Sequence, residues 1–198
     1  MLTLRYSSAS PYARKVRIAA DLLGLAGRIQ ISTADTADPN DPIRAQNPLG
    51  KIPTLLLEHG FALYDSRVIV EYLDHLAGGG ALFPTDPARR FLALRLQALG
   101  DGICDAALLL RYEETTRPPE ARSGSWTELQ QGKIDRAIAA LESAPPVGPT
   151  DIGHIAVACA LGYLDLRFGG AWRANAPKLV AWLDTFARET PAFEATKA

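Results

Sequence analysis

The stretch Ser7–Arg17, SSASPYARKVR, places a serine directly before a proline where a helix is predicted to begin. Proline is favoured at the first helical position, because the N–H that it lacks would have no partner there. Ser10 is therefore the predicted N-cap. A serine at this position can simply cap the helix, which is worth about 1 kcal/mol. It can also donate its hydroxyl to an anion such as a thiolate, beside the free N–H groups and the positive end of the helix dipole.

Two further stretches hold residues suited to binding. In NPLGKIPTLL, Pro53 stands at the start of an apolar strand. A cis Ile52–Pro53 bond would turn the backbone N–H and C=O of Ile52 toward an extended peptide ligand, whereas a trans proline would only start an edge strand. In YDSRVIVEYL, Asp65 and Ser66 precede a predicted helix. They either cap that helix or bind a ligand, with Ser66 on a carboxylate and Asp65 on an amino group.

The elements around these residues form an α+β pattern over the first 76 residues. Alternating apolar residues in 2–4 and 29–31 predict two short strands, and the helix between them makes their pairing parallel. His59-Gly60 between two apolar runs predicts an antiparallel hairpin, which a helix over 66–76 follows. The predicted order is thus β-α-β, loop, β-β-α. The apolar face of the last helix is predicted to consist of Val68, Ile69, Tyr72, Leu73 and Leu76.

Everything after this pattern is predicted to be helical. The stretch AGGGALFPTDP indicates a flexible connection over 79–86, which divides the chain into domains 1–78 and 87–198. The helices of the second domain are predicted at 87–116, 126–143, 151–168 and 175–188. Asp151 can cap the third of these helices. His154 cannot replace the carboxylate of a full capping box at neutral pH.

Composition excludes several classes of protein. The net charge of the 198 residues is −1, so the chain has no basic field for binding nucleic acid. No segment approaches the roughly 18 apolar residues of a membrane span, and the start MLTLRYSS does not have the pattern of a signal peptide. Cys104 and Cys159 lie in apolar helical patterns and are predicted to be buried thiols of a cytoplasmic protein. No metal-ligand spacing occurs, so no metal site is expected.

The three stretches in this order resemble one family. SxxxxxVRIA, NPLGKIPTL and LYDSRVIVEYL are similar to the glutathione-binding motifs of cytosolic glutathione transferases, and the second half resembles bacterial members of the serine type. The resemblance covers essentially the whole chain. It implies a thioredoxin-like N-terminal domain followed by an all-α helical-bundle domain. It also implies a homodimer that uses glutathione as co-substrate to attack small hydrophobic electrophiles, with a role in detoxification.

The resemblance assigns roles on the glutathione side of the site. Ser10 would activate the thiol, although Ser7, Ser8 and Tyr6 remain alternatives. Ile52, with Pro53, would pair its backbone with the cysteinyl part of glutathione, while Asp65 and Ser66 would hold the γ-glutamyl end. The glycine carboxylate would be reached by Lys51 and, with weaker support, by Arg14.

The electrophile side is assigned less specifically. The first long helix of the second domain would line it, with Tyr12 reaching across from the first domain. The positions expected there are Tyr12, Ala106, Leu109, Arg111 and Tyr112, of which Ala106 and Leu109 fit plain helix packing better.

The ligand would supply the thiol that the chain lacks. Glutaredoxin-like proteins carry cysteines at positions that here hold Ser10 and Ala13, and no cysteine precedes Cys104, which excludes a dithiol mechanism in this domain. Lowering a thiol pKa of about 8.5 by about two units takes ~2.7 kcal/mol, which one hydrogen bond to a charged group and a helix terminus can supply. Two alternatives stay open: a non-catalytic glutathione-binding or regulatory relative, and a glutathione-dependent isomerase or dehalogenase.

Overall fold

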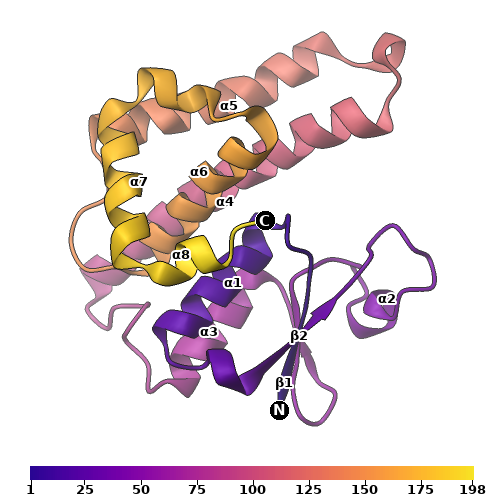
Figure 1. Ribbon diagram of the computed structural model, residues 1–198, viewed down its shortest axis with the longest axis vertical. Helices are drawn as coiled ribbons and strands as arrows, with labels where there is room; N and C mark the ends of the chain where they lie inside the picture. The colour runs from indigo at the N-terminus through magenta and orange to yellow at the C-terminus, as the bar shows by residue number, and fades with distance from the viewer.

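The computed structural model describes all residues 1–198 (Figure 1). A four-stranded sheet forms the core of the N-terminal half, in the order β2-β1-β3-β4. β1 pairs parallel with β2 and antiparallel with β3, which in turn pairs antiparallel with β4. The predicted β-α-β and β-β-α units are confirmed. The strands are β1 (Leu2–Tyr6), β2 (Ile29–Thr33), β3 (Thr54–Leu56) and β4 (Ala62–Leu63).

Two helices cover one face of this sheet, and the loop that carries a third lies on the opposite side (Figure 1). The central side chains Leu4 and Leu55 are fully buried beneath them. The turn-rich loop before β3, for which no helix was predicted, contains one helical turn. The helical elements of this half are α1 (Pro11–Leu22), η1 (Ala26–Arg28), α2 (Ile43–Gln46) and α3 (Ser66–Leu76).

The predicted apolar face of α3 is wrong in one position. Val68 is 46% exposed, and Val70 is fully buried in its place. The buried stripe runs through Ser66, Ile69, Val70 and Leu73, which is the i, i+3, i+4, i+7 pattern of a helix packed on a sheet. The helix therefore buries the side that begins at Ser66.

The connection between the halves, predicted as a flexible segment, is joined by hydrogen bonds to the preceding helix. The buried carboxylate of Asp74 accepts hydrogen bonds from the backbone N–H groups of Gly80 (2.9 Å) and Leu82 (2.7 Å). Leu82 and Phe83 are themselves buried in the core. The glycines of this segment bring the chain around to the start of the next helix, and Asp74 fixes its path.

The second half is helical throughout. α4 and α5 form a long antiparallel pair, α6 runs through the centre, and α7 and α8 close the side near α1 (Figure 1). The short helix α8 was not predicted, because five residues are too few for an apolar period. None of the helices combines the length and apolar character that crossing a bilayer would require. The elements are α4 (Pro87–Thr116), η2 (Pro119–Ala121), α5 (Gly124–Ser143), α6 (Ile152–Phe168), η3 (Ala171–Asn175), α7 (Pro177–Glu189) and α8 (Pro191–Ala195).

The start of α6 departs from expectation. Asp151 caps it as predicted, accepting from Gly153 N–H at 2.9 Å. His154 Nδ1 lies 2.8 Å from the Asp151 carboxylate and 3.4 Å from the Asp151 backbone N–H, so the imidazole does complete a capping box. The expectation that His154 could not take this place was wrong, because a ring nitrogen can reach the same backbone group as a carboxylate.

The two halves meet along α1. Lys15, which is 1% exposed, donates to both carboxylate oxygens of Asp101 on α4, at 2.6 and 2.8 Å. Burial raises the pKa of the Asp101 carboxyl, and the ammonium of Lys15 opposes that effect. Because removing one partner of a buried ion pair leaves an uncompensated charge, this pair fixes how α1 sits against α4.

Candidate glutathione and electrophile site

Ser10 is the N-cap of α1. Its Oγ accepts a hydrogen bond from the Ala13 N–H at 3.2 Å, in the extended backbone conformation that caps require. A hydroxyl that accepts through a lone pair keeps its own hydrogen free to donate. The N–H of Tyr12, in the first turn, has no partner within the chain. Two donors thus stand together at the positive end of a helix, which is an arrangement suited to an anion.

The alternatives to Ser10 differ in what surrounds them. The Ser7 carbonyl accepts from the Ser10 N–H at 3.1 Å, which closes the turn between β1 and α1. The ring of Tyr6 lies under the guanidinium of Arg17, at 5.5 Å. Ser8 lines the same cavity as Ser10. Of the three alternatives, Ser8 shares the surroundings of Ser10 most closely.

The loop before β3 presents a free backbone. The Ile52–Pro53 peptide bond is cis, as the resemblance implies. The N–H and C=O of Ile52 make no hydrogen bond within the chain. Lys51 is exposed, and its ammonium has no partner within the chain. A peptide ligand could therefore pair with Ile52 without displacing an internal bond.

Asn47 holds this loop in place, a role that sequence reasoning missed. Its buried amide donates to the Lys51 carbonyl and to Thr54 Oγ1, both at 3.0 Å. The Thr54 hydroxyl donates to the same carbonyl at 2.9 Å. Asn47 is the first residue of the NPLGKIPTL motif. The sequence does not show that its side chain is buried, and burial is what gives its amide this role.

Asp65 and Ser66 stand at the start of α3, as predicted. Asp65 is the N-cap and accepts from the Arg67 N–H at 2.9 Å, while the Arg67 guanidinium donates to its other oxygen at 2.8 Å. Burial alone would raise the pKa of the Asp65 carboxyl, but the hydrogen bonds from Arg67 outweigh it and hold that pKa below its usual range. Ser66 is buried, and its hydroxyl makes no hydrogen bond within the chain. Arg67, to which no role was assigned, thus keeps the carboxylate charged.

The residues predicted for the electrophile side are scattered along two helices. The Tyr12 hydroxyl donates to Asp105 of α4, and burial raises the pKa of this phenol. Tyr12 therefore joins the halves rather than pointing freely into a cleft. Arg111 pairs with Glu114 at 2.7 Å on the surface of α4, and Tyr112 is exposed. Ala106 is buried in the helix packing, whereas Leu109 is exposed.

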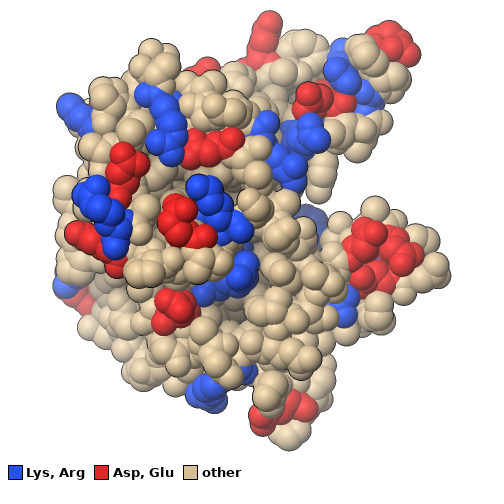
Figure 2. Space-filling view, viewed as in Figure 1, with Lys and Arg blue, Asp and Glu red and all other residues tan.

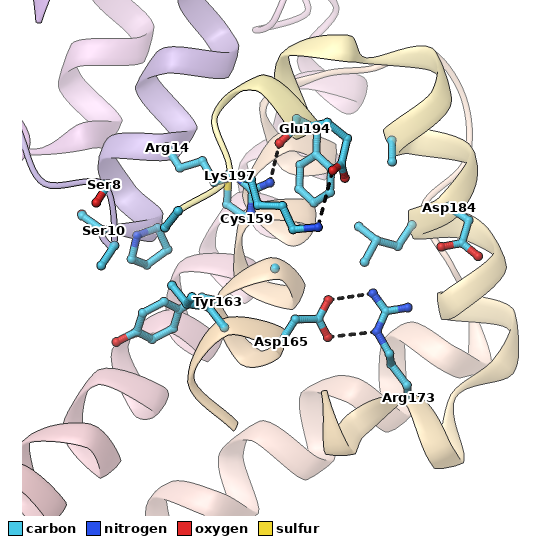
Figure 3. Close-up of a pocket in the computed structure, with 18 residues that line it drawn as sticks. Ser8, Ser10, Arg14, Cys159, Tyr163, Asp165, Arg173, Asp184, Glu194 and Lys197 are labelled. Carbon is cyan, nitrogen blue, oxygen red and sulfur yellow. Dashed lines mark hydrogen bonds and ion pairs between the residues drawn. The ribbon is translucent and has the colours of Figure 1, made fainter. Parts of the chain in front are cut away.

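Two hollows adjoin these residues. Figure 2 shows a deep notch between the far ends of α4 and α5 and the part of the chain that carries α2. A separate cavity of about 230 Å³ opens beside Ser10, between α1, α6, α7 and α8 (Figure 3). Ser10 lines this cavity, whereas none of Ile52, Asp65 and Ser66 does.

The cavity itself was not predicted, although Ser8 and Ser10 in its lining were. Ser8, Ser10 and Tyr163 lie at one end of it in Figure 3, and Asp184 and Arg173 lie at the other. Tyr163 of α6 is almost fully buried. Residues of four helices line the cavity, and no local pattern in the sequence indicates that these helices meet.

Neither cysteine can act as a nucleophile here. Cys159 lines the cavity, but burial raises the pKa of its thiol to about 12. Burial also raises the pKa of Cys104. Because the thiolate is the reactive form, both side chains stay inert near neutral pH. A thiol reaction in this site needs a thiol that comes with the ligand.

The fold defines a class: a thioredoxin-like half followed by an all-helical half. Within that class, the family models for the glutathione S-transferase N-terminal and C-terminal domains match residues 9–76 and 124–185. The uncharacterized glutathione S-transferase-like protein YibF of Escherichia coli (strain K12) is 32% identical over 191 residues, which cover 93% of each chain. The chain therefore belongs to the glutathione S-transferase family.

Solved structures of glutathione transferases are similar to this chain over its whole length. A glutathione transferase family member from Pseudomonas fluorescens Pf-5, with bound glutathione, is 42% identical and covers 100% of this chain and 98% of its own, with a TM-score of 0.91. The family member from the same organism, with bound S-(propanoic acid)-glutathione, is 42% identical over 100% and 99% of the two chains, with a TM-score of 0.88. A glutathione S-transferase from Methylobacillus flagellatus KT with bound glutathione is 35% identical over 100% and 99%, with a TM-score of 0.91.

Proposed function

We propose that this protein is a serine-type glutathione transferase in which Ser10 stabilises the thiolate of bound glutathione for attack on a small hydrophobic electrophile. The observation that carries the proposal is the hydrogen bond from the Ala13 N–H to Ser10 Oγ (3.2 Å), which leaves the hydroxyl hydrogen available at the start of α1. A hydrogen bond to a charged group is worth about 1.5–3 kcal/mol, which lowers a thiol pKa by about one to two units.

The rest of glutathione is proposed to lie across the ends of β3 and α3. Ile52 would pair its free backbone with the cysteinyl residue, beside the cis Pro53. Asp65, kept charged by Arg67, would take the amino group, and Ser66 the γ-glutamyl carboxylate. Lys51 is free to reach the glycine carboxylate. The Pseudomonas fluorescens and Methylobacillus flagellatus relatives that hold glutathione support this proposal.

The electrophile is proposed to approach from the side of α4, α6 and α8. The sulfur forms a bond to the electrophilic carbon, and either a leaving group departs with its electron pair or, in an addition, the neighbouring carbon takes a proton from water. Tyr12, Arg111 and Tyr112 stay our predicted contacts on this side. The S-(propanoic acid)-glutathione held by a relative is a conjugate of the kind that an addition produces. We therefore propose conjugation as the reaction, rather than isomerisation or dehalogenation.

A homodimer is proposed as the working form. Large apolar side chains are exposed just before β4 and on α3 and α4, namely Phe61, Val68, Phe91 and Leu92. An ion pair between Glu71 of α3 and Arg90 of α4 brings the two helices together beside them. Exposed apolar side chains close together favour a protein interface. The division into domains 1–78 and 87–198, joined by 79–86, is likewise proposed.

The test is the pKa of the bound thiol. Thiolate absorbance at about 240 nm is titrated for glutathione bound to the wild type, to Ser10→Ala and to Ser8→Ala. The wild type should hold the pKa about two units below the free value, and Ser10→Ala should return it by about one to two units, while Ser8→Ala leaves it low. The control is Ser123→Ala, because Ser123 caps α5 in the same way, accepting from Trp126 N–H at 3.3 Å.

Three results contradict the proposal. If glutathione binds with an unshifted pKa, the chain is a binding protein and not a transferase of this kind. If the pKa is low but unaffected by Ser10→Ala, another group activates the thiol. A return of the pKa in Ser8→Ala would assign the activation to Ser8.

A further inference from the structure

Arg14 is a buried cation in the wall of the cavity beside Ser10. It is 8% exposed, although it lies only one turn after Ser10. Its Nη2 donates to the Phe193 carbonyl and its Nε to Thr196 Oγ1 at 3.3 Å, and the Phe193 ring lies 4.0 Å from the guanidinium carbon. Arg14, which the resemblance gave as a weaker candidate for the glycine carboxylate, thus faces α6 and α8 (Figure 3).

The guanidinium keeps unused donors. An arginine has five N–H groups, and the two bonds above use the edge formed by Nε and Nη2. Nη1 has no acceptor within the chain. A Cβ on Gly162 would lie 2.3 Å from Nη1, so α6 gives Nη1 its room by having no side chain at this position. The fork between Nη1 and Nη2 is the part of arginine that binds a carboxylate with two parallel hydrogen bonds.

Arg14 makes no ion pair, unlike the other two cations of the cavity. Arg173 donates to both oxygens of Asp165, at 2.6 and 2.9 Å, and Lys197 lies 3.5 Å from Glu194. No carboxylate oxygen lies within 4.0 Å of the Arg14 nitrogens. Burial lowers the pKa of Arg14, and the charges of Glu194 and Asp165 oppose that effect from beyond ion-pair distance. Because both of these carboxylates already have a cationic partner, the guanidinium of Arg14 can bind an incoming anion.

We propose that this cavity selects electrophiles that carry a carboxylate, and that Arg14 binds that carboxylate while Ser10 holds the attacking sulfur. The inference rests on the proposed function. Residues four apart on a helix have Cβ atoms about 5–6 Å apart, so Ser10 and Arg14 can serve the two ends of one small molecule. The substrate class is a short carboxylic acid whose reactive carbon lies a few bonds from the carboxylate.

An α,β-unsaturated carboxylate shows how the step balances. The thiolate sulfur forms a bond to the β-carbon, and the π electron pair of the alkene moves to the α-carbon, delocalised onto the carboxylate. Water then gives the α-carbon a proton, and the hydroxide left behind is neutralised by the buffer. Negative charge on the carboxylate grows during the attack, so a guanidinium fixed there stabilises the transition state more than the ground state.

The competing explanation is that Arg14 only anchors α8. An anchor would act on every electrophile alike, whereas a carboxylate-binding residue discriminates between charged and neutral ones. The experiment therefore compares acrylic acid with acrylamide, which share the same alkene. For each, kcat/KM is divided by the uncatalysed rate constant with glutathione at the same pH, and the KM for glutathione is measured alongside.

The wild type should accelerate acrylic acid more than acrylamide. Arg14→Met should reduce this preference about 10- to 100-fold, as expected for a lost hydrogen-bonded charge pair. Arg14→Lys keeps the positive charge but loses the two parallel donors of the guanidinium, so it should reduce the preference about tenfold. This variant also tests the inference if Arg14→Met does not fold. The matched control is Arg173→Met combined with Asp165→Leu, which removes both partners of an ion pair of the same cavity and leaves no unpaired charge. It should leave the preference as in the wild type.

Several outcomes overturn the inference. One is a wild type without preference for acrylic acid, and another is an equal loss for both electrophiles in Arg14→Met, which would make Arg14 an anchor. A raised KM for glutathione in that variant would instead place the glycine carboxylate on Arg14. If neither electrophile is accelerated, the inference fails, and the thiol pKa decides separately whether the proposed function survives.

Discussion

Ser10, Ile52 and Asp65 each stand at or beside the end of the element that positions them, whereas Arg14, Gly162 and Phe193 meet only because α1, α6 and α8 pack together. The first group offers a hydroxyl, a free backbone and a carboxylate, all fixed by caps and turns within a few residues. The second depends on contacts between residues that are up to 182 positions apart. Under the two proposals above, thiol activation would be encoded locally, and the choice of electrophile would be encoded in tertiary packing.

The largest effect on stability is expected where α1 of the N-terminal half meets α4 of the helical half. Lys15→Met should lower the free energy of unfolding by about 3–5 kcal/mol, because it leaves the Asp101 carboxylate buried without a partner. Lys15→Met combined with Asp101→Leu should recover much of that loss, since the uncompensated charge is gone. Denaturant titration measures both. If the single variant is as stable as the wild type, the pair does not fix α1 against α4.

The same difference explains what the sequence could predict. The order of strands and helices was predictable because apolar periods and Gly/Pro signals are local. Ser10, Asp65 and Ser66 were found because caps have a spacing, and the family resemblance gave that spacing a function. The cavity that Arg14 and Tyr163 line was not predicted, because a helical period cannot tell which neighbour covers a face. Asn47 was recognised without a role, since its hydrogen bonds follow from burial.

The next effect concerns the glutathione side alone. Asp65→Asn should raise the KM for glutathione about 10- to 100-fold, because a hydrogen bond between two charged groups becomes one to a neutral amide. The kcat should fall much less. Steady-state kinetics at saturating electrophile separates the two parameters. The control is Asp86→Asn, which changes the corresponding cap of α4, where Asp86 accepts from Arg89 N–H at 2.9 Å.

An unchanged KM for glutathione in Asp65→Asn would contradict the proposed role of Asp65 in binding glutathione. It would mean that the cap of α3 serves only the helix and that glutathione is held by backbone groups. A large loss of kcat at unchanged KM would place Asp65 in thiol activation instead.

A smaller effect is expected from Tyr12, whose hydroxyl connects α1 of the N-terminal half to α4 of the helical half. Tyr12→Phe removes the hydrogen bond to Asp105 and should lower the free energy of unfolding by about 0.5–1.5 kcal/mol. If Tyr12 also touches the electrophile, the KM for a neutral electrophile should rise severalfold while that for glutathione stays the same. Thermal unfolding measures the contribution of Tyr12 to the contact between α1 and α4, and steady-state kinetics measures whether it contacts the substrate. A stability change without any change in KM would remove Tyr12 from the electrophile side.

The smallest effect in the wild type is the pH dependence of glutathione affinity, and Arg67 is the residue that makes it small. Because the pKa of Asp65 lies below the ordinary value of about 3.9, its carboxylate should stay charged and the affinity should change less than about twofold between pH 7 and 5. Arg67→Met removes the guanidinium but keeps the backbone N–H of residue 67, which still donates to Asp65, and the charge of Lys15. The pKa of Asp65 should therefore rise from its lowered value, and the affinity should fall as the pH drops through the new value. Calorimetric titration across this range measures the difference. A wild type and an Arg67→Met variant with the same profile would show that Arg67 does not maintain the charge of Asp65, and the glutathione side would then depend on fewer side chains than we propose.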